Sequence, residues 1–274
     1  MFESGREDII EFCLRYMISK SAFSVLAGEL NLSLSRTVLN ANAARRAMLL
    51  KDVKEVTVTL DCLRTFCRRN WQPPNKELHV TNLKSGLLRG HNWHGTAPSR
   101  LHQGLQNKVR ECADGRLGLD EFLKIGGDIA KQEYFIVATH DLIETAIIEG
   151  FHSVIPSIAT RGISDFIFQE VPYDLKHTGL PGEWTFERAR KDRLAFAKSL
   201  SQRADTERIR QQAEGSINDW GFNRFYVVVR DLENWLINPK GVLAATVGAT
   251  EKLGKPLTFQ IDPVTIKCQV VFVE

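Results

Sequence analysis

Residues 162–178 read GISDFIFQEVPYDLKHT, and this stretch decides the fold that we expect. It contains two short segments rich in apolar residues, ISDFIFQ (163–169) and VPYDLKHT (171–178). Segments of this length and composition are typical of β-strands. The two segments adjoin near Gln169 and Glu170, and almost no residues separate them. The sequence therefore predicts two neighbouring strands joined by a tight turn.

Three charged residues of this stretch form a candidate catalytic group. Side chains two residues apart on a strand point to the same face, so Asp174 and Lys176 project together while Leu175 faces the core. A hairpin would bring Asp165 alongside them. Two carboxylates suit Mg²⁺, which prefers hard oxygen ligands, and a nearby ammonium can assist phosphodiester hydrolysis. The alternative is an ordinary Asp–Lys pair at an exposed strand end.

Helices and strands alternate on both sides of this stretch. Apolar residues follow helical spacing through residues 119–150, and residues 151–155 suit a strand. A long charged helix is expected over 185–213, followed by a buried strand within 222–232. The chain ends in KCQVVFVE, which is typical of another strand. This order predicts an α/β domain.

The first part of the chain has a different character. Residues 6–50 have the apolar spacing of helices, and residues 26–38 partly match a helix-turn-helix, although two packed core helices explain them as well. Residues 54–60 alternate as a short strand does, and the chain from 70 to about 118 suits loops and short helices. We expect a mainly helical region over residues 1–115 and a second domain over 116–274.

The second domain resembles the PD-(D/E)xK nuclease superfamily, which includes type II restriction endonucleases. The resemblance rests on an acid on one strand, Asp165, and on an acid–apolar–Lys triplet on the next strand, residues 174–176. A helix, a Gly-aromatic pair and a strand precede Asp165, as they do in the family. It covers residues from about 133 to 178, and Ser164 stands where the family often has Pro. The resemblance implies a restriction-endonuclease-like core, in which helices flank a mixed central sheet.

The same resemblance implies a site and an activity. Asp165 and Asp174 would bind Mg²⁺, Lys176 would assist the attacking water, and an acid on the preceding helix would complete the ligand set. Glu144 is the candidate for that acid, with Asp141 and Glu133 as rivals. The implied reaction is hydrolysis of double-stranded DNA at a specific site by a homodimer, because a two-fold protein matches a palindrome. The alternatives are a defence or repair nuclease without sequence preference and a DNA-binding regulator with an inactive nuclease fold.

Residues outside this core are candidates for contacts with DNA. They are polar and basic side chains in the helix-turn-helix-like segment and in the loop over residues 89–104: Ser35, Arg36, Arg89, Asn92 and Arg100. The charged helix over 185–213 could contact phosphates, or it could be a solvated helix with internal ion pairs.

Composition sets the general class of the protein. The 274 residues are 43% hydrophobic and 25% charged, which is ordinary for a chain that buries a core, and the net charge is +3. No apolar run is long enough to span a bilayer, and the acidic N-terminus is unlike a signal peptide, so we expect a cytoplasmic protein. The five cysteines are expected to be free thiols rather than zinc ligands.

Overall fold

The computed structural model describes residues 9–30, 58–90, 99–159, 164–212, 219–261 and 264–274. The chain forms two compact units, and each consists of three separate segments. The first unit contains Met1–Gln72, Phe151–Asp174 and Arg210–Asn223, and the second contains Pro73–Gly150, Leu175–Ile209 and Arg224–Glu274. The predicted division into residues 1–115 and 116–274 stays a prediction. No helix in the described ranges is long and apolar enough to cross a membrane.

A six-stranded sheet has the order β1-β2-β3-β4-β6-β5. The strands are β1 (Ile155–Pro156), β2 (Phe166–Phe168), β3 (Val171–Thr178), β4 (Arg224–Val229), β5 (Leu257–Ile261) and β6 (Val264–Val273). The pairs β1–β2, β2–β3 and β5–β6 are antiparallel, whereas β4–β6 is parallel. The expectation of an α/β protein with a mixed sheet flanked by helices is confirmed.

The first unit has a core built by helices and by the start of the sheet. Its helical elements are η1 (Cys13–Met17), α2 (Lys20–Glu29), α5 (Leu60–Asn70) and η2 (Asp219–Phe222). Apolar side chains of the first three, among them Met17, Leu63 and Phe66, form one buried cluster with Phe12, which precedes η1, and with Ile155 and Ile167 from β1 and β2. These side chains are almost fully removed from water. Their burial therefore stabilises the packing of β1 and β2 against α5.

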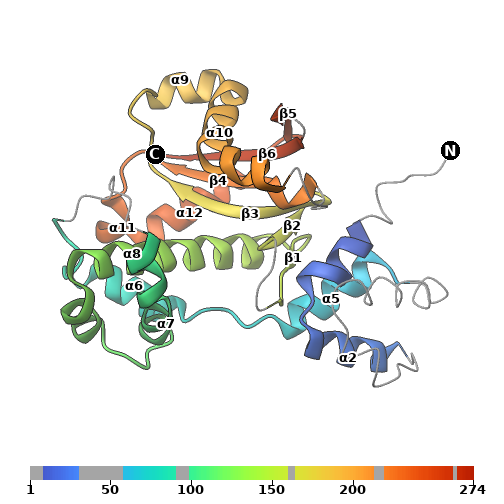
Figure 1. Cartoon of the computed structure of the whole chain (residues 1–274), viewed down its shortest axis with the longest axis horizontal. Helices are drawn as coiled ribbons and strands as arrows, with labels where there is room; N and C mark the ends of the chain where they lie inside the picture. Colours follow the sequence, from blue (N-terminus) through green and yellow to red (C-terminus); the bar gives the residue numbers. More distant parts are fainter. Residues whose placement is uncertain (1–8, 31–57, 91–98, 160–163, 213–218, 262–263) are drawn as a thin grey trace. The chain divides into compact units, whose positions relative to one another are not determined.

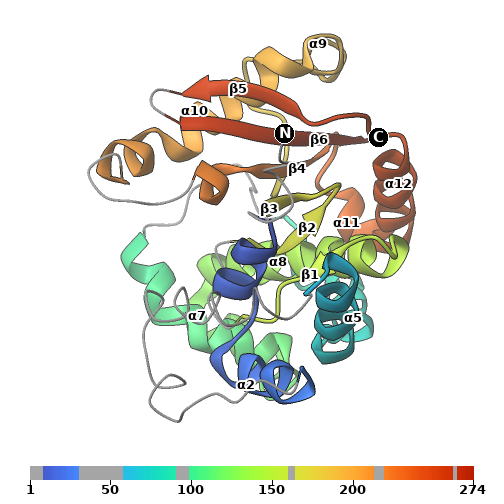
Figure 2. The ribbon, with the colours of Figure 1, turned by 90° about the vertical axis from the view of Figure 1, so that its right-hand side faces the viewer.

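The second unit has helices on both faces of its strands. They are α6 (Lys76–Lys84), α7 (Ser99–Ala113), α8 (Leu119–Gly150), α9 (Phe186–Lys191), α10 (Arg193–Gln212), α11 (Asn234–Ile237) and α12 (Pro239–Glu251). Figure 1 shows α10 on one side of β4 and β6, with α8 and α12 on the other. On the α10 side, Ser201 and Tyr226 share a hydrogen bond of 3.1 Å. Figure 2 shows β4, β6 and β5 side by side in the order given above.

Two long predicted helices have different outcomes. The helix expected over 119–150 is confirmed as α8, with a kink at Gly127, where φ is 53° and ψ is −134°. A side chain rarely tolerates such a backbone conformation, so glycine suits it. The helix expected over 185–213 is broken, because α9 ends before Asp192 and α10 begins after it. The Asp192 side chain accepts the N–H of Ala195 at 3.1 Å, as an N-cap does.

Other predictions need correction or lie outside the described residues. The sequence predicts a strand over 54–60, but residues 54–57 lie outside the described part of the chain. Residues 58–60 do not form a strand, because Thr59 is the N-cap of α5 and Leu60 is its first residue. The strand predicted over 151–155 is reduced to β1, because the chain turns at Val154, whose N–H bonds the Phe151 carbonyl. Residues 31–38 of the helix-turn-helix-like segment lie outside the described residues.

Candidate functional site

The hairpin predicted around residues 162–178 is present, and its turn is tight. Phe168 pairs with Val171, so only Gln169 and Glu170 lie between the strands. Both turn residues have positive φ, 50° and 60°. Two consecutive residues of this kind are typical of a type I′ turn, whose twist matches that of the flanking strands. The turn therefore fixes the register of β2 against β3.

Backbone hydrogen bonds hold Asp165 beside the middle of β3. Asp165 directly precedes β2, and its N–H donates to the carbonyl of Tyr173 at 2.8 Å. Its own carbonyl accepts the N–H of Ser157 at 2.8 Å. Asp174 follows Tyr173, and its N–H donates to the carbonyl of Asn223 at 3.1 Å. The first unit thus brings Asp165 next to the Tyr173–Asp174 step, and both aspartates are half-buried.

Side chains alternate along β3 as the sequence predicts. Tyr173 and Leu175 are fully buried, whereas Asp174 is half-buried and Lys176 is exposed. Because successive side chains on a strand point to opposite faces, Asp174 and Lys176 leave the strand on the same side. This polar face meets water at Lys176, and a charged ligand could reach it from there.

His177 lies on the buried face of β3 and has a structural role. Its Nε2 accepts the indole N–H of Trp235 at 3.0 Å, and its Nδ1 lies 3.1 Å from the Thr139 hydroxyl. Because the indole can only donate, Nε2 is unprotonated and Nδ1 carries the proton. The Thr139 hydroxyl in turn donates to the carbonyl of Phe135 at 2.7 Å. Burial, with a smaller contribution from His140, lowers the pKa of His177 to about 3.

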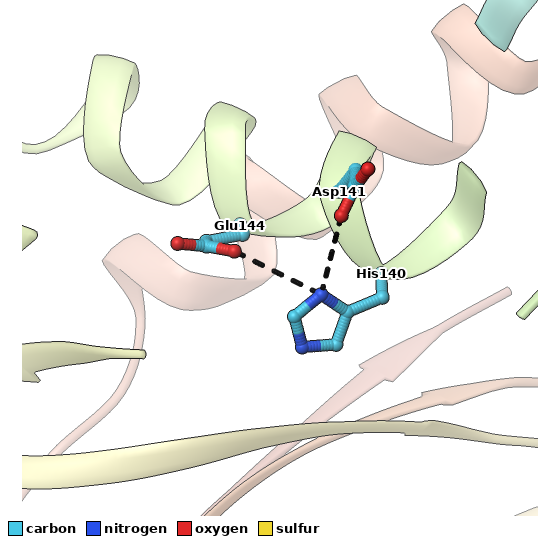
Figure 3. Close-up of side chains that lie close together, drawn as sticks. All are labelled: His140, Asp141 and Glu144. Atoms are coloured by element: carbon cyan, nitrogen blue, oxygen red, sulfur yellow. Dashed lines mark ion pairs between the residues drawn. The ribbon is translucent and has the colours of Figure 1, made fainter. Parts of the chain in front are cut away.

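Helix α8 carries a second group of ionisable side chains, shown in Figure 3. His140 Nδ1 lies 3.7 Å from an oxygen of Asp141 and 3.8 Å from an oxygen of Glu144. One ligand atom from each of the three residues lies within 4.8 Å of the others, close enough to hold one metal ion. Residues at positions i and i+4 share a helix face, which accounts for the approach of His140 to Glu144.

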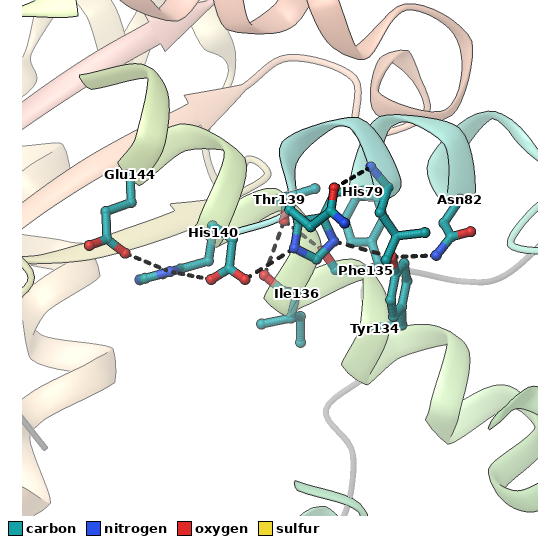
Figure 4. A network of polar contacts seen from close by, with 11 residues as sticks. His79, Asn82, Tyr134, Phe135, Ile136, Thr139, His140 and Glu144 are labelled. Carbon is teal, nitrogen blue, oxygen red and sulfur yellow. Dashed lines mark hydrogen bonds and ion pairs between the residues drawn. The ribbon is translucent and has the colours of Figure 1, made fainter. Parts of the chain in front are cut away.

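A buried network that contains His79, Asn82 and Tyr134 (Figure 4) orients Asp141. The second oxygen of Asp141 lies 3.2 Å from Nε2 of His79, which is completely buried. His79 Nδ1 lies 3.1 Å from the Tyr134 hydroxyl, and Asn82 donates to the same hydroxyl at 2.7 Å. Burial raises the pKa of the Asp141 carboxyl, but hydrogen bonds from His140 and His79 outweigh it and leave that pKa below its usual value. Asp141 is therefore held as a carboxylate.

The three acids considered for the helix position have different surroundings. Glu144 and Asp141 belong to the group around His140, whereas Glu133 is buried seven residues before His140, about 10 Å along the helix. Asp165 and Asp174 belong to the first unit, whereas Lys176 and Glu144 belong to the second. The assignment of Glu144 as a metal ligand stays a prediction.

The residues predicted to contact DNA are only partly described. Arg89 is exposed in a turn after α6. Arg100 lies in α7, and Ser35, Arg36 and Asn92 lie outside the described residues. His140 was not among the predicted site residues. Its spacing of four residues from Glu144 on an expected helix is the signal that could have identified it.

Comparisons with known proteins give no relative for this chain. No family model and no curated protein matches its sequence, and no solved structure matches its fold.

Proposed function

We propose that this protein is a metal-dependent DNA endonuclease whose active site is the β2–β3 hairpin. One observation carries the proposal: backbone hydrogen bonds hold Asp165 beside the Tyr173–Asp174 step, and Lys176 shares a strand face with Asp174. The resemblance to the PD-(D/E)xK superfamily assigns catalytic roles to these three residues. The strand order, in which β3 lies between the β2 hairpin partner and β4, is compatible with such a core.

The side chains at the hairpin fit a hard divalent cation. Asp165 and Asp174 offer carboxylate oxygens at a half-buried position, and Mg²⁺ is commonly held by one or two carboxylates together with water and substrate phosphate. Glu144 is the proposed third ligand, since Asp141 is already oriented by His79. Bound Mg²⁺ would supply a water of lowered pKa and would neutralise charge on the phosphoryl group.

Lys176 completes the proposed chemistry of the hairpin. It is exposed, and it leaves β3 on the same side as Asp174. A lysine ammonium carries a compact positive charge with three donors. In the proposed reaction this charge orients the attacking water and stabilises the negative charge that develops on the phosphate in the transition state.

A basic groove on α5 supports a nucleic acid as the substrate. Three arginines, Arg64, Arg68 and Arg69, line a cavity of about 430 Å³ together with His152 and two acids, and Arg68 also donates to the carbonyls of Phe151 and Val154. Arg64 pairs with the exposed Asp61, and Arg69 pairs with Glu29. Exposed ion pairs of this kind contribute little free energy, so phosphates can compete for the guanidinium groups. We extend the proposal to double-stranded DNA cut at a specific site by a homodimer, as in type II restriction endonucleases.

The test is incubation of the purified protein with plasmid DNA and Mg²⁺, with a chelator as the metal-free control. Discrete products support a site-specific enzyme, and a smear supports a nuclease without sequence preference. Asp174→Ala and Lys176→Ala should abolish cleavage, whereas Glu170→Gln, which removes a charge from the same hairpin, should not. DNA binding without cleavage in Mg²⁺ or Mn²⁺ would favour a regulator instead and would contradict the proposal.

A further inference from the structure

A second cavity in the first unit lies next to the end of β1, the strand that pairs with β2. Its volume is about 590 Å³, within the range of small-molecule sites. Three segments form its walls: the start of α2 with Ser19, the end of α5 with Asn70, Trp71 and Gln72, and the chain that follows β1, residues 157–159. A cavity assembled from segments so distant in sequence depends on the fold of this unit.

The chemistry of the walls suits a neutral planar ring. Trp71 offers an aromatic surface, and Asn70 and Gln72 offer amide groups. The residues that line the cavity, all within the described ranges, include no acid and no base. Asn70 Nδ2 donates to the Phe66 carbonyl at 2.9 Å, which fixes that amide. The Trp71 indole N–H and the Gln72 amide make no hydrogen bond within the described part of the chain, so both can bind a ligand.

One wall of this cavity is hydrogen-bonded directly to the candidate catalytic residue. The N–H of Ser157 donates to the carbonyl of Asp165 at 2.8 Å, and the next residue, Ile158, donates to the carbonyl of Met17 at 2.7 Å. The first turn of α2 forms another wall, and the N-terminus of a helix favours anions such as phosphate. Through Ser157, the chain that lines this cavity is bonded to the backbone that carries Asp165.

We propose that the cavity receives one nucleobase of the nucleic-acid substrate, which is unpaired and rotated out of the double helix. The base stacks on Trp71, and the amide of Gln72 forms hydrogen bonds with its edge. Stacking on an aromatic side chain tolerates every base, whereas amide contacts discriminate among them. This inference rests on the proposed function for the identity of the substrate, and it adds a binding site that the hairpin chemistry alone does not require.

The test measures binding separately from cleavage. The Asp174→Ala protein is titrated with short fluorescent homopolymers of dA, dC and dT, and Trp71→Leu is compared with Trp71→Phe in the same background. Both substitutions leave an apolar side chain, but only phenylalanine can stack. We expect Trp71→Leu to weaken binding of at least one strand about tenfold and Trp71→Phe to stay within about threefold. Gln72→Ala, at an exposed position, should change the order of preference among the three strands.

Each outcome has a defined meaning. Equal binding by Trp71→Leu and Trp71→Phe, or no binding by the Asp174→Ala protein, overturns the nucleobase site. If the unsubstituted protein still cuts DNA in that case, the proposed function stands without the cavity. If binding depends on Trp71 but the protein never cuts DNA, the nucleobase site stands and the nuclease proposal fails. Thermal unfolding of both Trp71 variants shows whether their folds are intact.

Discussion

The β2–β3 hairpin and helix α8 each carry two acids of the candidate sites, and the contacts described around these acids differ. On the hairpin, backbone hydrogen bonds to Tyr173 and Asn223 hold the segments that carry Asp165 and Asp174. On α8, imidazole side chains contact Asp141 and Glu144. An acid whose position depends on the backbone can exchange side-chain partners without loss of the fold, whereas an acid within a buried network supports the fold. We therefore expect hairpin substitutions to cost activity and substitutions in the buried network around Asp141 to cost stability.

The largest expected effect is on the rate of cleavage, when one acid from each region is substituted. Asp165→Asn should lower the rate of plasmid cleavage about 1000-fold, because it removes a charged ligand at the reacting phosphate. Glu144→Gln should lower the rate only about tenfold, because Glu144 is the third proposed ligand and Mg²⁺ can be held by the two hairpin carboxylates with water and phosphate. Single-turnover cleavage measures both rates, and urea unfolding shows whether each variant is folded. A loss in Glu144→Gln as large as that in Asp165→Asn would mean that Glu144 is as essential for cleavage as the hairpin acids, and would contradict this ranking.

The buried network on α8 gives the next largest effect. His79→Phe should lower the free energy of unfolding by about 2–3 kcal/mol, since it removes the buried imidazole that contacts both Asp141 and the Tyr134 hydroxyl and leaves them only His140 and Asn82 as partners. Urea denaturation at neutral pH measures the change. Asp61→Asn breaks an exposed ion pair and is the control, for which little change is expected. A His79→Phe protein as stable as its parent would show that the network does not support the fold.

The lowered pKa of His177 predicts how the stability of the protein depends on pH. Its pKa is about 3 in the folded protein, against an ordinary value of 6.5, so between these values the unfolded chain binds more protons. The stabilisation is complete above pH 6.5 and is lost as pH falls toward 3, by up to about 1.4 kcal/mol per pH unit. His177→Gln removes the titrating group and should flatten this slope. The same slope in both proteins, measured by urea denaturation at a series of pH values, would assign the pH dependence to other groups.

The smallest expected effect concerns the hairpin turn. Gln169 and Glu170 both have positive φ, which costs free energy in any residue other than glycine and is tolerated best by asparagine. The double substitution Gln169→Asn with Glu170→Gly should therefore raise the free energy of unfolding by about 1 kcal/mol and leave cleavage unchanged. Thermal unfolding and plasmid cleavage measure the two effects. Reduced cleavage in this variant would show that the turn contacts the substrate.

Local pattern determined much of the hairpin region. Alternation along residues 171–176 predicted that Leu175 is buried and Lys176 exposed, because side-chain direction on a strand depends only on position. The tight turn at Gln169 and Glu170 followed from the short separation of two apolar segments. The long helix α8 followed from apolar spacing, since many turns of helix repeat the same signal.

Only the tertiary structure decided which distant residues meet. His79 and Asp141 are 62 residues apart in the chain, and no local signal links them. Likewise, Trp71 and Ser157 line one cavity because α5 and β1 share a buried core. The sequence by itself determined the direction of side chains on single elements, because that depends on backbone geometry. Contacts between elements depend instead on how the whole chain buries its apolar surface, and therefore only the folded chain defines them.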